Sequence, residues 1–148
     1  MSKKARSESS RVASLIRANK AEFYIADIDL DDPTEIQQVP ELVNKTLGRW
    51  VCAYMIIAAS ATKICVCSYV PEKFQDRLNA KDWQLSSNLS ATLTQANVGN
   101  NTIFFRECQS DDAFKLKDVV RANGFKYLSD QGCMGEADSS DEYNLEDF

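Results

Sequence analysis

Apolar residues follow a helical spacing near the start of the chain and an alternating spacing directly afterwards. Val12, Leu15 and Ile16 are three and four positions apart along one face, which predicts a short amphipathic helix over residues 11–19. Side chains then alternate in direction over residues 21–29, which is the pattern of a strand. The chain is therefore expected to open with a helix and a strand.

A second helix begins with a capping sequence. Asp32 is the predicted N-cap, Pro33 occupies the first helical position, where its missing N–H costs nothing, and Glu35 can reach back to the cap. Apolar residues at helical spacing follow, and Gly48 ends the helix. Pro40 interrupts it, because a proline in a helix interior removes a hydrogen bond and crowds the preceding turn. We expect a kink or a restart there.

A hairpin and a further alternation of helix and strand complete the pattern. Residues 50–59 are almost wholly apolar and predict a buried strand, which a tight turn connects to a second strand over residues 63–70. The spacing then predicts a helix over residues 80–93, a polar loop over 94–101 and a strand core at 103–105. A last helix is expected to begin near Ser110 and to end at Asn123-Gly124.

This order predicts a single α/β domain with a mixed β-sheet, in the order β-α-β-β-α-β-α after a short N-terminal helix. With 148 residues, 44% of them hydrophobic, the chain is long enough to form one hydrophobic core. The predicted core contains six large side chains, which are Ile25, Met55, Ile57, Val66, Trp83 and Phe104.

Charge divides the chain into three parts. Residues 1–20 carry six bases and one acid, residues 130–148 carry seven acids and no base, and the middle has a surplus of three acids. The predicted division is a basic head with a short helix over 1–20, a globular domain over 21–129 and an acidic tail over 130–148. Residues 1–9 and 133–148 hold too little apolar surface to offset the entropy of ordering, so we expect both to be disordered.

The absence of histidine removes most catalytic arrangements, because no Ser–His or Cys–His nucleophile can form. None of the five glycines belongs to a phosphate-binding loop motif. Five cysteines without paired motif spacing suit neither a zinc site nor a disulfide framework, and they indicate free thiols in a reducing compartment. We therefore expect no catalytic residue, no metal and no cofactor.

Acids and tryptophans are the other candidates for a site. The acids lie at the carboxyl end of the first strand, where α/β sheets tend to bind ligands and where a divalent ion could bind. They also suit a loop and a helix cap, which is the interpretation we favour. The two tryptophans could stack on nucleic-acid bases, but each position also fits a core, and we expect burial. These residues are Asp27, Asp29, Asp31, Asp32, Trp50 and Trp83.

The part from Ala21 to Leu128 carries a series of motifs in a fixed order. After the first strand, the second helix and the apolar strand come Lys63-Ile64-Cys65-Val66-Cys67, then Val70-Pro71, then Leu78-x-Ala80-x-Asp82-Trp83. In these features the chain resembles C-Ala, the C-terminal domain of cytosolic eukaryotic alanyl-tRNA synthetases, which belongs to the DHH-associated class of domains. The resemblance implies a domain that contacts the outer elbow of tRNA and helps to couple aminoacylation to editing.

The chain departs from this family after the helix that follows the hairpin. The family carries a basic, glycine-rich stretch there, whereas residues 94–101 hold one glycine and no charge, which disfavours close approach of the backbone to phosphate. The catalytic and editing modules of a synthetase are absent as well. We therefore expect no enzyme activity and weak binding of tRNA or another structured RNA.

The predicted nucleic-acid-binding residues are seven bases of the middle part, to which the basic head adds non-specific attraction for phosphate. They are Lys73, Arg77, Lys81, Arg106, Lys115, Lys117 and Arg121. An alternative is a protein-interaction or regulatory module that kept the fold and lost nucleic-acid binding. In that case the acidic tail would bind a partner through Tyr143, Leu145 and Phe148.

Two further patterns concern location. No stretch reaches the roughly 18 apolar residues of a membrane span, and the first twenty residues lack the apolar segment of a secretory signal. We therefore expect a cytoplasmic protein with no membrane attachment.

Overall fold

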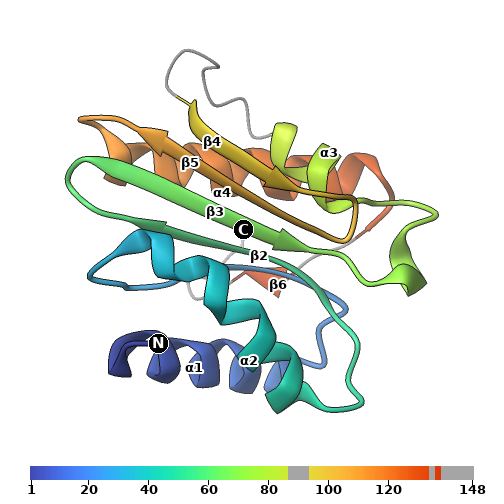
Figure 1. Cartoon of the computed structure of the whole chain (residues 1–148). Coiled ribbons are helices and arrows are strands. Elements are labelled where there is room, and N and C mark those ends of the chain that lie inside the picture. The colour runs from blue at the N-terminus through green and yellow to red at the C-terminus, as the bar shows by residue number, and fades with distance from the viewer. Residues whose placement is uncertain (87–93, 134–135, 138–148) are drawn as a thin grey trace, which may run out of the picture.

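The structure, a computed structural model, describes residues 1–86, 94–133 and 136–137 of the chain. Its centre is a six-stranded mixed sheet with the strand order β4-β5-β3-β2-β1-β6 (Figure 1). β1 pairs in parallel with β2 and with β6, and the other neighbouring strands are antiparallel. The strands are β1 (Phe23–Asp27), β2 (Ala53–Ala59), β3 (Lys63–Tyr69), β4 (Thr94–Gly99), β5 (Ile103–Gln109) and β6 (Glu136–Ala137).

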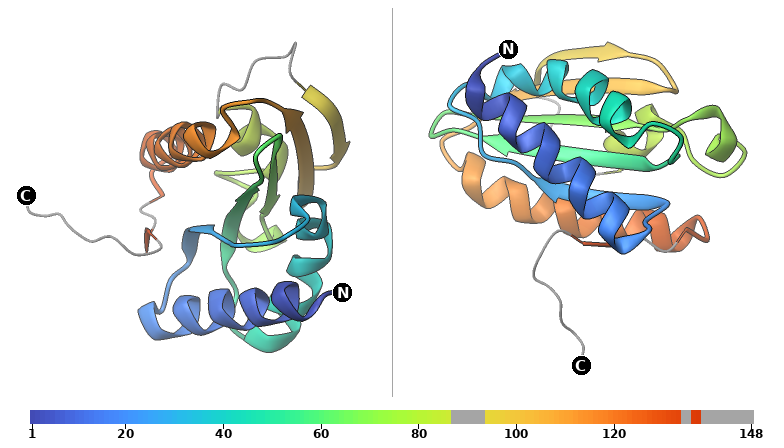
Figure 2. Two further views of the ribbon diagram at one scale, coloured as in Figure 1. Left: turned by 90° about the vertical axis from the view of Figure 1, so that its left-hand side faces the viewer. Right: turned by 90° about the horizontal axis from the view of Figure 1, so that it is seen from below.

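Helices cover both faces of this sheet, so the fold is a single α/β domain, as predicted. Figure 2 shows α1 and α2 on one side of the sheet and α4 on the other. The helices are α1 (Lys3–Asn19), the 3₁₀ helix η1 (Pro33–Gln38), α2 (Val39–Leu47), the 3₁₀ helix η2 (Glu72–Phe74), α3 (Ala80–Leu85) and α4 (Ala113–Asp130). We call residues 1–20 and 33–50 the N-terminal layer, and residues 71–86 and 110–131 the C-terminal layer.

The first helix is longer than the sequence pattern predicts. α1 begins at Lys3, eight residues before the predicted start, and the hydroxyl of Ser2 accepts a hydrogen bond from the amide of Ala5 at 3.1 Å. Ala5 and Ser9 are buried in the contact with the sheet and α2. The predicted disorder of residues 1–9 is therefore wrong for residues 3–9, because small side chains allow close packing without any large apolar residue.

The restart predicted at Pro40 is present. The chain forms η1 from Pro33 and then begins α2 at Val39, which places Pro40 in the first turn of the new helix. An N–H is not needed for a helical hydrogen bond at that position, so the proline is accommodated without loss. The side chain of Asp32 caps η1 as predicted, since it accepts a hydrogen bond from the amide of Thr34 at 3.1 Å.

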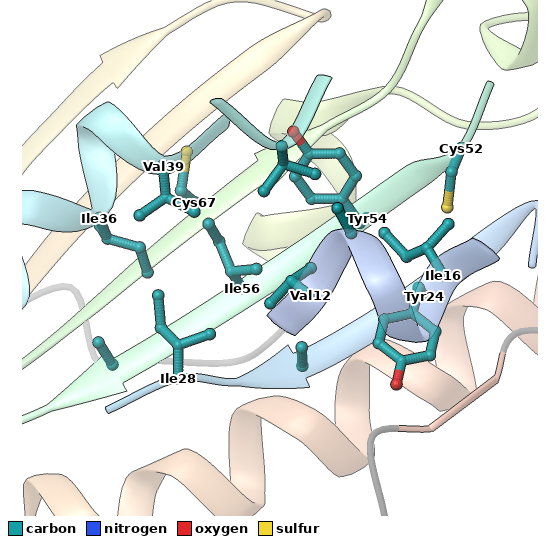
Figure 3. Close-up of a cluster of buried hydrophobic side chains, with 14 of the residues drawn as sticks. Val12, Ile16, Tyr24, Ile28, Ile36, Val39, Cys52, Tyr54, Ile56 and Cys67 are labelled. Carbon is teal, nitrogen blue, oxygen red and sulfur yellow. The ribbon is translucent and has the colours of Figure 1, made fainter. Parts of the chain in front are cut away.

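The predicted core is confirmed on the side of the C-terminal layer. All six predicted core side chains are buried there in one cluster, and Trp83 is its largest member. The indole N–H of Trp83 donates to the carbonyl oxygen of Gly124 at 3.1 Å, which joins α3 to α4. A second cluster lies under the N-terminal layer, where Val12 and Ile16 of α1 meet Tyr54 and Ile56 of β2 (Figure 3).

Gly124 corrects the predicted end of the last helix. α4 does not end there but continues to Asp130. A Cβ atom on Gly124 would lie 2.9 Å from the Cδ1 atom of Ile25 and 3.4 Å from the sulfur of Met55. The glycine is therefore required by the close approach of α4 to the sheet rather than by a turn.

Strands β4 and β6 form in two segments where the sequence predicts a loop and disorder. Residues 94–99, predicted as a loop, form β4 at the edge of the sheet. Disorder is expected from residue 133 onward, yet Cys133 is buried and β6 pairs with Tyr24 and Ile25 of β1. The remainder of the acidic tail, residues 138–148, and the end of the helix predicted over 80–93 lie outside the described residues.

Candidate nucleic-acid interface

The structure does not gather the seven predicted bases into one patch. Arg106 lies on the central part of the sheet in β5, and only 5% of the residue is exposed. A buried guanidinium cannot reach phosphate on the surface, so the prediction for Arg106 is corrected. The other six bases lie in the C-terminal layer.

Two of these bases are held by neighbouring rings and acids. The ammonium of Lys73 lies 3.8 Å from a carboxylate oxygen of Glu22 and 5.3 Å from the ring centre of Phe74. The guanidinium of Arg77 lies 5.6 Å from the ring centre of Phe23. Both side chains stay exposed, at 61% for Lys73 and 44% for Arg77, so these contacts orient the charges without burying them. Lys81 is also exposed on α3, and it makes no such contact among the described residues.

The bases of α4 differ from one another in the same way. Lys115 is exposed, whereas the ammonium of Lys117 lies 5.8 Å from the ring centre of Phe114. Arg121 points toward the sheet, and its Nη1 atom lies 3.0 Å from Oδ2 of Asp27 at the end of β1. Both side chains of this ion pair are mostly buried, so the pair joins α4 to the sheet.

Acids balance the bases of the C-terminal layer. Residues 71–86 and 110–131 contain seven bases and also seven acids. A polyanion that approaches this layer as a whole would therefore meet no net attraction, and charges more than a Debye length of about 10 Å away are screened. The bases of this layer leave no surplus of positive charge.

The N-terminal layer has the opposite balance. Residues 1–20 and 33–50 contain eight bases and three acids, a surplus of five positive charges. Two of the bases are engaged at the carboxyl end of β1. Lys4 lies 3.1 Å from Asp29 and 3.2 Å from Asp31, and the hydrogen bonds that its ammonium donates to these carboxylates raise the pKa of Lys4. Arg11 donates to Glu8 at 3.0 Å and to the backbone carbonyl of Asp27 at 2.7 Å.

The acids at the carboxyl end of β1 take part in these contacts. Asp27, Asp29 and Asp31 pair with Arg121 or Lys4. Asp32 caps η1, and the hydroxyl and amide of Thr34, which donate to it, lower its pKa. Among the described residues no group of three or more potential ligands could hold a metal ion.

The thiols are protected from chemistry by burial. All five cysteines are free and buried. Loss of contact with water raises the pKa of Cys65 and of Cys67 to about 12, and it also raises the pKa of Cys52 and of Cys133. A thiol that stays protonated is a poor nucleophile and a poor metal ligand. The cysteines are therefore core residues.

The two tryptophans have different environments, although both were expected to be buried. Trp83 is fully buried as predicted. Trp50 is 38% exposed, because β2 begins only at Ala53 and leaves Trp50 in the connection after α2. Its indole N–H donates to the carbonyl oxygen of Ala21 at 2.7 Å. No pattern in the sequence distinguishes Trp50, because an apolar run predicts a buried strand along its whole length.

The partner-binding residues predicted in the tail, Tyr143, Leu145 and Phe148, lie outside the described residues and remain a prediction. Within the described ranges, no helix is both long enough and apolar enough to cross a membrane.

Comparisons with known proteins show what this chain resembles. No protein-family model matches the chain, and no curated protein matches it in sequence. Among solved structures, it matches the C-Ala domain of Aquifex aeolicus alanyl-tRNA synthetase with a TM-score of 0.52 and 16% identity, over 72% of this chain and 90% of that domain. Matches to RecJ from Thermus thermophilus, with bound Mg²⁺, and to a manganese-bound RecJ exonuclease have TM-scores of 0.42 and 0.41 at 13% identity. They extend over 82% and 81% of this chain but only 18% and 28% of those proteins. The chain thus has the fold of a C-Ala domain.

Proposed function

We propose that this protein is a non-catalytic RNA-binding module whose ligands are tRNA or similarly structured RNAs. The observation that carries the proposal is the match to a domain of a tRNA synthetase over nine tenths of that domain's length. Because a shared fold does not by itself imply a shared function, the surface of this chain has to supply the binding.

The charge of one layer supports binding of nucleic acid, and three other features disfavour catalysis. One helical layer carries a surplus of five positive charges, which Asp29 and Asp31 beside it offset in part by pairing with Lys4. Its remaining bases can attract the phosphates of a nucleic acid. Histidine is absent, the thiols are buried, and the acids at the end of β1 are paired. These observations support binding rather than catalysis, and the proposal includes the absence of enzyme activity.

The proposal has two finer parts. Five free thiols suit a reducing compartment, so we propose a cytoplasmic location. The order of the motifs around Asp82-Trp83 supports kinship with the cytosolic eukaryotic form of C-Ala, as a divergent copy.

A mobility-shift titration with total tRNA tests the function. Affinity should fall as salt is raised from about 50 mM to about 200 mM, because phosphate contacts release counterions. A duplex DNA of similar length serves as the competitor control, since it offers phosphates without the tRNA shape. The function is wrong if the full chain gives no shift with tRNA even at the lower salt concentration.

A further inference from the structure

The carboxyl ends of α1 and α2 lie side by side on one face of the molecule (Figure 2). The guanidinium of Arg17 in the last turn of α1 donates to the carbonyl oxygen of Thr46 in the last turn of α2 at 3.1 Å. The indole N–H of Trp50, just past α2, donates to Ala21, just past α1, at 2.7 Å. Two contacts therefore fix the geometry of this region.

Four exposed bases surround the two helix ends. They are Arg17 and Lys20 from the end of α1, and Lys45 and Arg49 from the end of α2. Among the described residues none of the four has an acid within 4 Å, although Glu41 lies one turn before Lys45 on α2. We call these four bases together with Trp50 the helix-end patch.

Helix dipoles account for only part of this patch. A base in the last turn of a helix is stabilised by the partial negative charge of the free carbonyl groups, and this applies to Arg17 and Lys45. Lys20 and Arg49 lie beyond the last turn. Their charges remain without a structural use in this layer.

Lys20 has an unfavourable backbone conformation as well. Its φ and ψ of 51° and 41° are in the left-handed region, where glycine is favoured at the end of a helix. Lys20 is the one residue other than glycine with a positive φ in the described part of the chain. Backbone strain that is retained with a charged side chain is typical of a functional position.

Trp50 adds an aromatic surface beside these charges. The hydrogen bond to Ala21 anchors the polar edge of the indole, while 38% of the residue is exposed next to Arg49. A ring that is fixed at one edge and open to solvent can stack on an unpaired base at little cost in entropy. Positive charges around an exposed ring are the usual composition of a surface that binds single-stranded nucleic acid.

We propose that the helix-end patch is the RNA-binding site of this protein, with phosphates held by Lys20, Lys45 and Arg49 and an unpaired base stacked on Trp50. This inference rests on the proposed function but assigns it to the N-terminal layer. Six of the seven predicted binding residues lie on the opposite side of the sheet, in the C-terminal layer, whereas the basic head was expected to add only non-specific attraction.

The test compares two triple variants that each remove three positive charges. The first, Lys20→Gly, Lys45→Gln and Arg49→Gln, changes the helix-end patch. The second, Lys73→Gln, Arg77→Gln and Lys81→Gln, changes the C-terminal layer and is the matched control. In tRNA binding as a function of salt, the first variant should lose about 2–3 units of log–log slope, at about 0.7–0.9 for each phosphate contact, and the second should lose less than one unit.

Lys20→Gly alone separates binding from folding. Glycine relieves the left-handed backbone conformation, so this variant should unfold at a higher urea concentration than the wild type while it binds tRNA more weakly. A loss of affinity in a more stable protein cannot be attributed to misfolding.

Tryptophan fluorescence tests the stacking directly, since the chain has two tryptophans and Trp83 is fully buried. Poly-uridylate should quench the emission of Trp50, and Trp50→Leu should abolish the quenching and lower the affinity about tenfold. If the control triple variant binds tRNA more weakly than the wild type and the helix-end triple variant does not, the inference is overturned and the proposed function stands. The absence of any wild-type binding at low salt would overturn both.

Discussion

The two helical layers pack on the same sheet but use their charges differently. In the C-terminal layer bases and acids are equal in number, and Lys73, Arg77 and Arg121 contact acids or rings of the protein itself. The N-terminal layer has a surplus of five positive charges, which Asp29 and Asp31 at the end of β1 offset in part by pairing with Lys4. The contrast shows that a list of bases is a poor guide to an electrostatic surface, because the acids of the same layer decide how much charge is left for a ligand.

The largest expected effect concerns the aromatic residue of each layer. Trp83→Ala should lower the free energy of unfolding by about 3–5 kcal/mol, because it empties a fully buried site and removes the bond to Gly124. Trp50→Ala, the matched change in the other layer, should cost about 1–2 kcal/mol, since the ring is partly exposed and makes one hydrogen bond. Urea unfolding of both variants measures the difference. Equal losses would show that Trp50 is a core residue and would remove the reason to see it as a stacking surface.

Alkaline pH should reveal the thiols beneath the N-terminal layer. Burial raises the pKa of Cys52, Cys65 and Cys67, so these thiols stay protonated in the folded chain while they ionise in the unfolded chain near their ordinary pKa. The three thiols make their full contribution to the free energy of unfolding below about pH 8, and this contribution is lost as the pH rises toward about 12. Between pH 8 and 9.5 the free energy of unfolding should fall by about 2–3 kcal/mol.

The replacement of Cys67 by alanine is the corresponding check. Urea titrations at several pH values should give a shallower pH dependence for Cys67→Ala than for the wild type. Equal slopes in the two proteins would contradict the burial of Cys67.

The close approach of α4 to the sheet can be tested at Gly124. Gly124→Val should cost about 1–3 kcal/mol, because its first carbon would already lie 2.9 Å from the side chain of Ile25. Ala122→Val on the exposed side of the same helix is the matched control and should cost only a few tenths of a kcal/mol, about the difference in helix propensity. Thermal unfolding that is equally affected by the two changes would argue against this packing.

The smallest expected effect concerns the ion pair between the C-terminal layer and the sheet. In a double-mutant cycle, Asp27→Asn and Arg121→Gln should show a coupling of about 1 kcal/mol, since the pair is shielded from solvent but still in contact with it. The coupling should decrease at high salt. Lys4→Gln, which breaks a more exposed pair at the other layer, should change stability by less than Arg121→Gln.

Sequence patterns predicted the parts of the fold that depend on local spacing. The hairpin of β2 and β3, the cap at Asp32 and the restart at Pro40 all follow from residues close together in the chain. Strand β4 did not follow, because an edge strand can be polar when helices do not cover it. The sequence predicts a helix end at Gly124, but the glycine allows close packing against Ile25, which lies about a hundred positions away in the chain.

The candidate site was less predictable for a related reason. Arg106 and Lys81 have the same charge in the sequence, and only the sheet around Arg106 makes it unavailable. The helix-end patch combines residues from two separate helices that are brought together by the Arg17 and Trp50 hydrogen bonds. Neither the number of charges nor the spacing of apolar residues predicts these two hydrogen bonds. The resemblance to C-Ala indicated the fold but not the surface.

The short strand β6 has a consequence for self-association. It pairs with β1 only at Tyr24 and Ile25, yet it is the strand that separates the backbone of β1 from solvent along that edge. A chain shortened to end at Cys133 would expose unpaired N–H and C=O groups beside a strand of buried apolar residues, which is a template for adding a strand from another molecule. Two residues at the end of the described chain thus protect the sheet against edge-to-edge aggregation.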